Sequence, residues 1–292
     1  MNAFNIFAAF IFFIFSILFA IALVIIFLSM LGLVKIRASS RVNISRKIVG
    51  EKKRESVPIS VKELTGVHDF IINEFIDNLE KPIKTPYLMA VYGGSGSGKS
   101  FVSEVISGTI KKIFPTTCAN VTIISQDSYY KGGNKDTDYD VPESIDFDLL
   151  TNHIEMLLQD KTIECPTYDF VTHQRTNKTV TIIPCKIIIV EGILICTQER
   201  LRNLFNMKIF IDAKESTQVF RRLKRDIKER GRTIEEVENR YKRDVAPSYQ
   251  QHVLPSANFA DMRINNDGEE NYVGLETVLN HIITVLNKIC RN

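Results

Sequence analysis

A glycine-rich stretch in the first third of the chain has the residue types and spacing of a phosphate-binding loop. The sequence VYGGSGSGKS at 91–100 places Gly93, Gly98, Lys99 and Ser100 in the pattern G-x-x-x-x-G-K-[ST]. In such a loop the backbone N–H groups and the N-terminus of the following helix attract anionic oxygens. Lys99 is expected to reach the β- and γ-phosphates of a nucleotide, and Ser100 to ligate Mg²⁺. Because GTPases, ATP-driven motors and small-molecule kinases share this loop, it does not choose the reaction.

Two acidic residues follow strand-like runs and could serve phosphate chemistry. Asp127 comes directly after the run at 121–125, and Glu191 ends the apolar part of IIIVEG at 187–192. Asp127 could accept the proton of an attacking hydroxyl or hold a metal-bound water; a turn cap is the alternative interpretation. Glu191 stands where phosphate-loop enzymes hold Mg²⁺ or its water. A GTPase would instead carry D-x-x-G at this point together with an N-K-x-D motif, and neither is in place.

The segment FRRLKRDIKERGR at 220–232 contains a cluster of arginines. Its members are Arg222, Arg225, Arg230 and Arg232. Arg222 and Arg225 would share one helix face, and Gly231 is typical of the end of a helix. Positive charge over a transferring phosphoryl group stabilises its transition state. The alternative is a solvated helix with ion pairs such as Arg222 with Asp226, but the number of arginines favours a functional cluster.

A further set of residues lies in PTYDFVTHQR at 166–175. Tyr168, Phe170 and His173 combine aromatic rings with an imidazole that can both donate and accept hydrogen bonds. Such a set could stack on a base and bind its edge. A lone histidine is more often a surface residue, and the periodicity of the segment does not decide between these interpretations.

The elements that must position these residues are short apolar runs alternating with amphipathic ones. Strands are predicted at 87–92, 121–125, 186–190, 208–212 and 260–265, and helices at 99–114, 144–158, 215–230, 234–253 and 272–289. Continuous apolar strands suit a parallel sheet covered on both faces. Ligands bind beyond the carboxyl ends of such strands. The segment 161–184 interrupts the alternation and predicts a β-hairpin flap.

The first 34 residues have the composition of a membrane span. Between Ile6 and Val34 only Ser16 and Ser29 are polar. A helix of this length would measure about 43 Å at 1.5 Å per residue, enough to cross a hydrocarbon core of about 30 Å. A cleaved signal peptide would need a basic start and a much shorter apolar run. We therefore expect a single-pass membrane anchor at 1–34.

The positive charge of the chain is concentrated after this anchor. Residues 35–55 carry eight Lys or Arg against two Glu, in a chain of net charge +3. Such a flank stays on the cytoplasmic side, so the globular part should face the cytosol. The flank could bind anionic lipids or serve as a solvated linker. The rest of the chain is slightly acidic, which argues against a nucleic-acid partner, and the cysteine spacing favours a reducing compartment. We expect a basic linker with one helix at 35–85 and a phosphate-loop domain at 86–292.

Together these motifs resemble the uridine–cytidine kinase family. The matching segments are GGSGSGKS (93–100), SQDSYY (125–130), YDVPESIDFDLL (139–150), PTYDFVTH (166–173), VEGIL (190–194) and RRLKRDIKERGR (221–232). The resemblance extends over about 86–286. It implies a three-layer α/β sandwich with a five-stranded parallel P-loop sheet, an arginine-bearing lid and a β-hairpin flap. Since the family is usually homotetrameric, it also implies a homo-oligomer.

The resemblance implies a reaction and its phosphate machinery. The family transfers the γ-phosphoryl group of ATP or GTP, with Mg²⁺, to the 5′-hydroxyl of uridine or cytidine. Asp127 would be the catalytic base, and Lys99, Arg225 and Arg230 would hold the transferred phosphate. The donor would be held by the loop residues Gly93, Gly94, Ser95, Gly96, Ser97, Gly98, Lys99 and Ser100, and by Phe101. Ser100 and Glu191 would bind the metal.

The resemblance also implies a nucleoside pocket. Its expected members are Asp140 and Arg222 for the ribose hydroxyls, Tyr130, Tyr168 and His173 for the pyrimidine, Phe170 packing beside it, and Arg232. The chain departs from the family at two places within this scheme. Arg240 stands where the family usually has Gln, and is retained as a nucleoside-contacting candidate. The segment 265–269, NNDGE, replaces a Pro-Arg-Gly turn near the donor's adenine, with Glu269 as a donor-binding candidate.

These observations favour a membrane-anchored uridine/cytidine kinase that faces the cytosol and acts in pyrimidine salvage. One alternative is a sister P-loop kinase for another ribosyl or pantoyl hydroxyl, against which the flap sequence YDF-x-x-H argues. The other is a catalytically silent nucleotide-binding regulator at the membrane. A silent protein would not need to keep Lys99, Asp127 and the arginine cluster together.

Overall fold

The computed structural model describes residues 72, 83, 85–114, 120–268 and 273–290, all of which belong to the unit His68–Asn292. The predicted membrane anchor at 1–34 lies outside the described residues, as does almost all of the predicted linker at 35–85. In the described ranges, no helix combines the length and the apolar character needed to span a bilayer.

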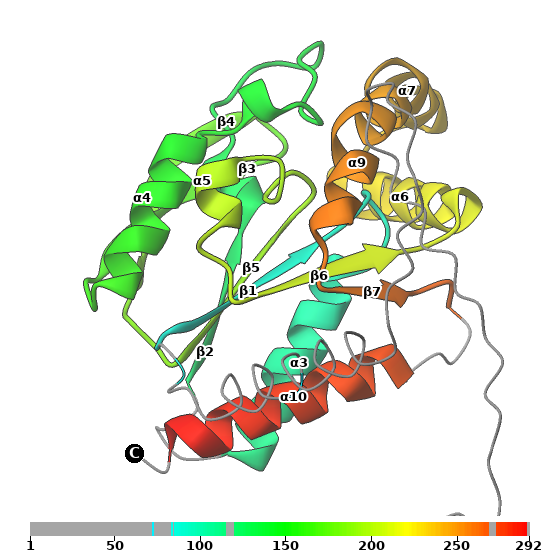
Figure 1. Ribbon diagram of the computed structural model, residues 1–292. Helices are drawn as coiled ribbons and strands as arrows, with labels where there is room; N and C mark the ends of the chain where they lie inside the picture. Colours follow the sequence, from blue (N-terminus) through cyan, green and yellow to red (C-terminus); the bar gives the residue numbers. More distant parts are fainter. Residues whose placement is uncertain (1–71, 73–82, 84, 115–119, 269–272, 291–292) are drawn as a thin grey trace, which may run out of the picture. The chain divides into compact units, whose positions relative to one another are not determined.

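A five-stranded parallel sheet forms the centre of the described structure (Figure 1). Its strands are β1 (Tyr87–Tyr92), β2 (Val121–Ser125), β5 (Ile187–Gly192), β6 (Met207–Asp212) and β7 (Met262–Asn265), in the spatial order β2-β5-β1-β6-β7. All four strand pairs are parallel. The parallel sheet expected from the alternating runs is therefore confirmed, as are the five strands implied by the family resemblance.

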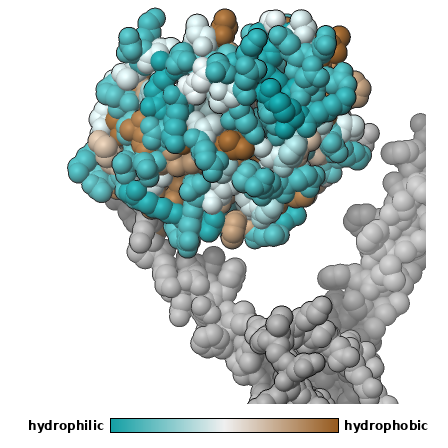
Figure 2. All heavy atoms as spheres, turned by 90° about the horizontal axis from the view of Figure 1, so that it is seen from above, coloured by the Kyte–Doolittle hydropathy of each residue, from teal (hydrophilic) through white to brown (hydrophobic). Residues whose placement is uncertain are grey.

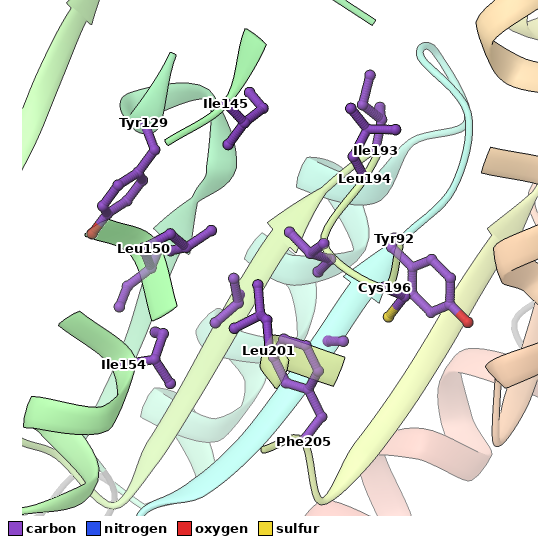
Figure 3. Close-up of a cluster of buried hydrophobic side chains, with 14 of the residues drawn as sticks. Tyr92, Tyr129, Ile145, Leu150, Ile154, Ile193, Leu194, Cys196, Leu201 and Phe205 are labelled. Carbon is purple, nitrogen blue, oxygen red and sulfur yellow. The ribbon is translucent and has the colours of Figure 1, made fainter. Parts of the chain in front are cut away.

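Helices cover both faces of this sheet. Alternate residues of β1 point to opposite sides: Met89 packs with α3 (Lys99–Ile113) and α10 (Val273–Ile289), whereas Leu88 packs with α4 (Phe147–Leu158) and α5 (Glu199–Arg202). Figure 3 shows the second cluster, with Tyr92 from β1 facing Cys196 and with Leu150 and Ile154 projecting from α4. Figure 2 shows a mostly hydrophilic described surface with scattered apolar side chains. The apolar side chains thus gather between three layers.

The β-hairpin predicted at 161–184 is confirmed as an antiparallel pair. It consists of β3 (Ile163–Asp169) and β4 (Gln174–Ile182). Arg175 on β4 donates to the backbone carbonyls of Tyr130 at 3.3 Å and Tyr129 at 3.1 Å, and pairs with Asp146 at 3.3 Å. These bonds hold the hairpin against the turn that follows β2.

The arginine-bearing helix α6 (Glu215–Arg230) ends at Gly231, which adopts φ 63°. That left-handed conformation costs glycine little and explains the stop predicted there. After it, α7 (Ile234–Arg240) begins with a capping box in which the Thr233 and Glu236 side chains each bond to the other's backbone N–H.

The uninterrupted helix predicted at 234–253 is wrong in detail. Beyond α7, π-helical turns at Tyr241–Val245 and Tyr249–Val253 alternate with short helices α8 (Ala246–Ser248) and α9 (Leu254–Ser256). Each π turn stops two residues before a proline, Pro247 or Pro255. Proline lacks an N–H, and its ring crowds the carbonyl four residues earlier. The helix accommodates this with turns that contain one more residue, in which the backbone hydrogen bonds join residues five apart.

A second difference is the start of the helix predicted at 144–158. It begins at Phe147, capped by the Asp146 carboxylate, which accepts from the N–H of Leu149 at 3.1 Å. A short 3-10 turn, Pro142–Ser144, precedes it. Proline at the start of that turn and aspartate at the cap explain the later helix start.

Candidate active site

The phosphate-binding loop lies between β1 and α3 at the carboxyl edge of the sheet. Gly98 adopts φ 97°, and a Cβ there would lie 2.1 Å from the side-chain nitrogen of Asn266. A Cβ on Gly96, which adopts φ 85°, would lie 2.3 Å from the carbonyl oxygen of Gln218 on α6. Both glycines are therefore required by close packing as well as by backbone conformation. The loop is held tightly between α6 and the segment after β7.

Lys99 and Ser100 begin α3 and lie beside the end of β5. Lys99 Nζ donates to the carbonyl of Gly94 at 3.0 Å, and Ser100 Oγ donates to Glu191 Oε1 at 3.1 Å. Burial lowers the pKa of Lys99 to about 8, although the charges of Glu191 and Asp127 oppose this shift. Lys99 thus converges with both acidic candidates.

The Glu191 carboxylate has the properties of a cation ligand. Burial raises its pKa, partly offset by the charge of Lys99 and the hydrogen bond from Ser100. Its second oxygen, Oε2, is buried without a hydrogen-bond partner. Hydroxyl and carboxylate oxygens suit Mg²⁺, which commonly keeps several waters and is held jointly with phosphates. Accordingly, Ser100 and Glu191 fit such an ion, although among the described residues no group of three His, Cys, Asp or Glu side chains could cage one.

Asp127 lies in the 3-10 turn Gln126–Tyr129 that follows β2. The turn is capped by Ser125, whose side chain accepts from the N–H of Asp127 at 3.3 Å. Because Ser125 opposes Glu191 in the β2–β5 register, Asp127 lies just beyond the sheet edge that carries Glu191. Since Ser125 caps the turn, the alternative interpretation of Asp127 as the turn cap is wrong, and the Asp127 side chain lines the same cavity as Lys99 and Glu191.

The arginine cluster converges on a single carboxylate. Asp226 is completely buried, and its oxygens lie 2.9 Å from Arg225, 2.9 Å from Arg232, 3.5 Å from Arg230 and 3.7 Å from Arg222. Burial alone would raise the pKa of Asp226, but the four positive charges together lower it. The ion pair of Arg222 with Asp226 exists, yet it is buried, so the solvated-helix alternative does not hold. The sequence reasoning missed the role of Asp226 as the common partner.

A buried ion pair joins the phosphate loop to the opposite wall. Arg222 Nη1 donates to Ser95 Oγ at 2.8 Å and lies 3.6 Å from Asp140 Oδ1. Burial raises the pKa of Asp140, and the charge of Arg222 opposes this shift. Arg222 therefore contacts the phosphate loop, the arginine cluster's carboxylate and Asp140 at once.

Aromatic rings form the other end of the site. Tyr139 and His173 stack with ring centroids 5.4 Å apart, while Tyr168 lies 5.2 Å from Tyr130 and 5.3 Å from Phe170. His173 adopts φ 56°, an uncommon value for a residue with a side chain. Burial, together with the charge of nearby Arg240, lowers its pKa. A neutral imidazole can both donate and accept hydrogen bonds.

One cavity joins these parts. Of the predicted site residues, it is lined by Ser95, Lys99, Ser100, Asp127, Tyr130, Asp140, Tyr168, Phe170, His173, Glu191, Arg222, Arg225, Arg230, Arg232 and Arg240. It is also lined by Ser125, Tyr139, Gly192, Ile193 and Asp244, which the sequence reasoning did not single out. Tyr139 begins the family-like segment YDVPESIDFDLL at 139–150, which could have identified it, whereas no sequence motif marks Asp244 in the π turn Tyr241–Val245.

The remaining predicted residues that the structure describes do not line this cavity. The loop residues Gly93, Gly94, Gly96, Ser97 and Gly98 form the turn between β1 and α3. Phe101 is 57% exposed on α3, and Glu269 lies outside the described residues.

Sequence comparisons with known proteins agree on one family. Residues 88–272 match the sequence profile described as phosphoribulokinase/uridine kinase family. A uridine kinase of Lactobacillus helveticus is 38% identical over 72% of this chain and 98% of its own length. Uridine-cytidine kinase 2-B of Danio rerio is 35% identical over 70% of this chain and 82% of its own. A solved structure from Silicibacter sp., provisionally assigned as a fructose transport system kinase, covers 66% of this chain and 97% of its own at 18% identity and a TM-score of 0.51. At that identity the likeness concerns the fold alone.

Proposed function

The chain belongs to the phosphoribulokinase/uridine kinase family of P-loop kinases, and we propose that it is a uridine/cytidine kinase that transfers the γ-phosphoryl group of ATP or GTP to the nucleoside 5′-hydroxyl. The observation that carries this proposal is the single cavity in which the phosphate loop, Asp127 and the aromatic end meet. A nucleoside of two unlike halves, one polar and one aromatic, fits such a cavity. Relatives described as uridine kinases support the same substrate class.

In the proposed reaction Asp127 is the general base. The 5′-hydroxyl oxygen attacks the γ-phosphorus, the bond from that phosphorus to the β–γ bridging oxygen breaks, and the hydroxyl proton passes to Asp127. The position of Asp127 just beyond β2, at the edge where Lys99 and Glu191 also lie, supports this role.

Positive charge around the cavity would stabilise the transferring group. Lys99, Arg225 and Arg230 would contact its oxygens, and charge-assisted hydrogen bonds of this kind gain strength where water is excluded. Mg²⁺, when bound, would supply further positive charge to offset that of the phosphates. Ser100 and Glu191 would hold it, in keeping with the orphaned Glu191 oxygen.

The nucleoside would bind across the other half of the cavity. Asp140 and Arg222 would bind the ribose hydroxyls, since a carboxylate accepts from both hydroxyls of a diol. The pyrimidine would be bound by Tyr130, Tyr168 and His173, packed beside Phe170. Arg232 and Arg240, which also line the cavity, would be further nucleoside contacts.

A nucleoside panel tests this function. Full-length protein, purified in detergent, is incubated with ATP or GTP, Mg²⁺ and one acceptor at a time, and ADP or GDP release is measured. Uridine and cytidine should support turnover, while purine nucleosides, pantothenate and free ribose should not. Turnover with another acceptor alone would identify a sister kinase. Nucleotide binding without any turnover would identify a silent regulator.

Membrane anchoring through 1–34, with the kinase domain in the cytosol, remains a separate proposal that rests on the apolar run and its basic flank. Carbonate extraction of membranes that contain the full-length chain tests it. Retention in the pellet is expected, and release into the supernatant would overturn the transmembrane assignment.

A further inference from the structure

The carboxylate of Asp226 organises the arginine cluster, yet it does not line the cavity. One oxygen, Oδ1, accepts from Arg225 Nε at 3.0 Å and pairs with Arg230 Nη1 at 3.5 Å. The other, Oδ2, accepts from Arg232 Nη1 at 2.9 Å and lies 3.7 Å from Arg222 Nε. All four arginines line the cavity. The buried carboxylate thus contacts the guanidinium groups without itself lining the cavity that they line.

The backbone of the same residue fixes the chain that carries two of these arginines. The Asp226 carbonyl accepts the N–H of Gly231, which ends α6, and the N–H of Arg232 at 3.1 Å. These bonds fold the chain back over the end of α6. Arg230 and Arg232, on either side of the glycine, can then reach the same carboxylate as Arg222 and Arg225.

Four guanidinium groups gathered in a partly buried site repel one another. Arginine does not lose its charge in proteins, and burial together with the neighbouring arginines lowers the pKa of Arg230 and of Arg232. Asp226 offsets one charge of the four, and Asp140, which pairs with Arg222 at 3.6 Å, offsets a second. The cluster therefore keeps a positive charge for an anionic ligand while its geometry is held by the carboxylate of Asp226.

We propose that Asp226 is a positioning residue that holds these guanidinium groups in place before the donor binds, so that Arg225 and Arg230 are already directed at the site of phosphoryl transfer. Asp226 would thereby help to stabilise the transition state, because guanidinium groups that are already oriented need no reorganisation at the moment of reaction. This inference rests on the proposed kinase function. Asp226 does not touch the substrate in this scheme, and it acts through the arginines.

The variant Asp226→Asn tests the proposal, because it keeps the size of the side chain and removes its charge. We expect kcat to fall about 10- to 100-fold, the effect of a small misplacement of catalytic groups. The Kd for ATP should stay equal to that of the wild type or become lower, since the cluster then carries one more net positive charge. A residue with a merely structural role would instead weaken ATP binding, lower the unfolding temperature and reduce kcat together, and that result would overturn the proposal. Unchanged kcat would also overturn it.

Two further variants keep the test decisive if Asp226→Asn does not fold. Asp226→Glu retains the charge and shifts it by one methylene group, so kcat should fall at least tenfold with ATP affinity preserved; wild-type kcat would contradict positioning. Asp261→Asn is the control. Asp261 pairs with Lys208 at 2.9 Å near the amino ends of β6 and β7, whereas the cavity lies at the carboxyl edge of the sheet. This variant should leave kcat unchanged.

The failure of the proposed function can be told apart from the failure of this inference. If the wild type phosphorylates no pyrimidine nucleoside, the uridine/cytidine kinase assignment fails. Binding of ADP with aluminium fluoride and Mg²⁺ then still tests the role of Asp226. That complex mimics the transferring phosphoryl group. We expect Asp226→Asn to weaken its binding at least tenfold relative to ATP binding, and equal effects on both ligands would overturn the inference.

Discussion

Arg222 lies 3.6 Å from Asp140, and the pair joins the arginine cluster to the wall of the cavity expected to receive the ribose. Both side chains are largely buried, and Arg222 also bonds to Ser95 of the phosphate loop. This pair therefore links the two substrates' expected positions. A change in this pair should affect acceptor binding first, because both members are expected to bind the ribose hydroxyls.

Replacing Asp140 by Asn should raise the KM for uridine about 10- to 100-fold, because hydrogen bonds to a charged group contribute roughly 1.5–3 kcal/mol. The KM for ATP should change much less. Steady-state kinetics with each substrate varied in turn measures both. The control is Asp136→Asn, an exposed residue of the same loop that does not line the cavity. An equal loss of affinity for both substrates would contradict the assignment.

The same carboxylate predicts a dependence of uridine binding on pH. Burial raises the pKa of Asp140, so this group takes up a proton at a higher pH than an ordinary aspartate. The protonated form loses its charge and one acceptor position. The KM for uridine should therefore rise as the pH falls through the raised pKa. The Asp140→Asn variant should show no such rise, and parallel pH profiles for the two proteins would contradict the interpretation.

Arg240 should matter for the nucleoside alone. Its Nη2 donates to the carbonyl of Lys135 at 2.7 Å, and its charge acts on His173 at the aromatic end. Arg240→Gln should raise the KM for uridine by about tenfold, equivalent to ~1.4 kcal/mol, with the KM for ATP unchanged. Lys242→Gln, which removes an exposed partner of Glu238, is the matched control. An unchanged or lower uridine KM in Arg240→Gln would show that the residue plays no part in acceptor binding.

Glu191 should govern the requirement for Mg²⁺. Glu191→Gln removes the charge beside the Ser100 hydroxyl, and loss of a ligand or of its supporting partner typically costs 10- to 100-fold in metal affinity. The Mg²⁺ concentration for half-maximal rate should rise at least tenfold. Glu155→Gln, which breaks an exposed ion pair with Arg200, should leave it unchanged. Identical Mg²⁺ titrations for Glu191→Gln and wild type would exclude a role for Glu191 at the metal.

The sheet and much of the cavity could be predicted from the sequence because local patterns specify them. Continuous apolar runs identified the strands β1, β2 and β5. Residues at the carboxyl ends of parallel strands lie at the same edge of the sheet. Asp127 and Glu191 could therefore be predicted to lie near Lys99, and all three line the cavity. The family resemblance then supplied the nucleoside-side residues that line the same cavity.

Other features depend on contacts that no local pattern encodes. Whether Asp226 pairs with one arginine in solvent or with four in a buried cluster depends on how the chain folds back after Gly231. The stacking of Tyr139 on His173 depends on the docking of the hairpin through Arg175. The π turns before Pro247 and Pro255 could not be predicted from hydrophobic periodicity, because that pattern assumes a regular α-helical repeat.

The most direct test of the central claim is the rate of uridine-dependent ADP formation by the full-length protein and by its Asp127→Asn variant. The wild type should form one ADP per UMP. The variant should lose about 10²- to 10⁴-fold in kcat, the usual contribution of a general base, while binding ATP normally. Full activity in Asp127→Asn would contradict the base assignment, and absence of ADP formation with both uridine and cytidine in the wild type would contradict the kinase account itself.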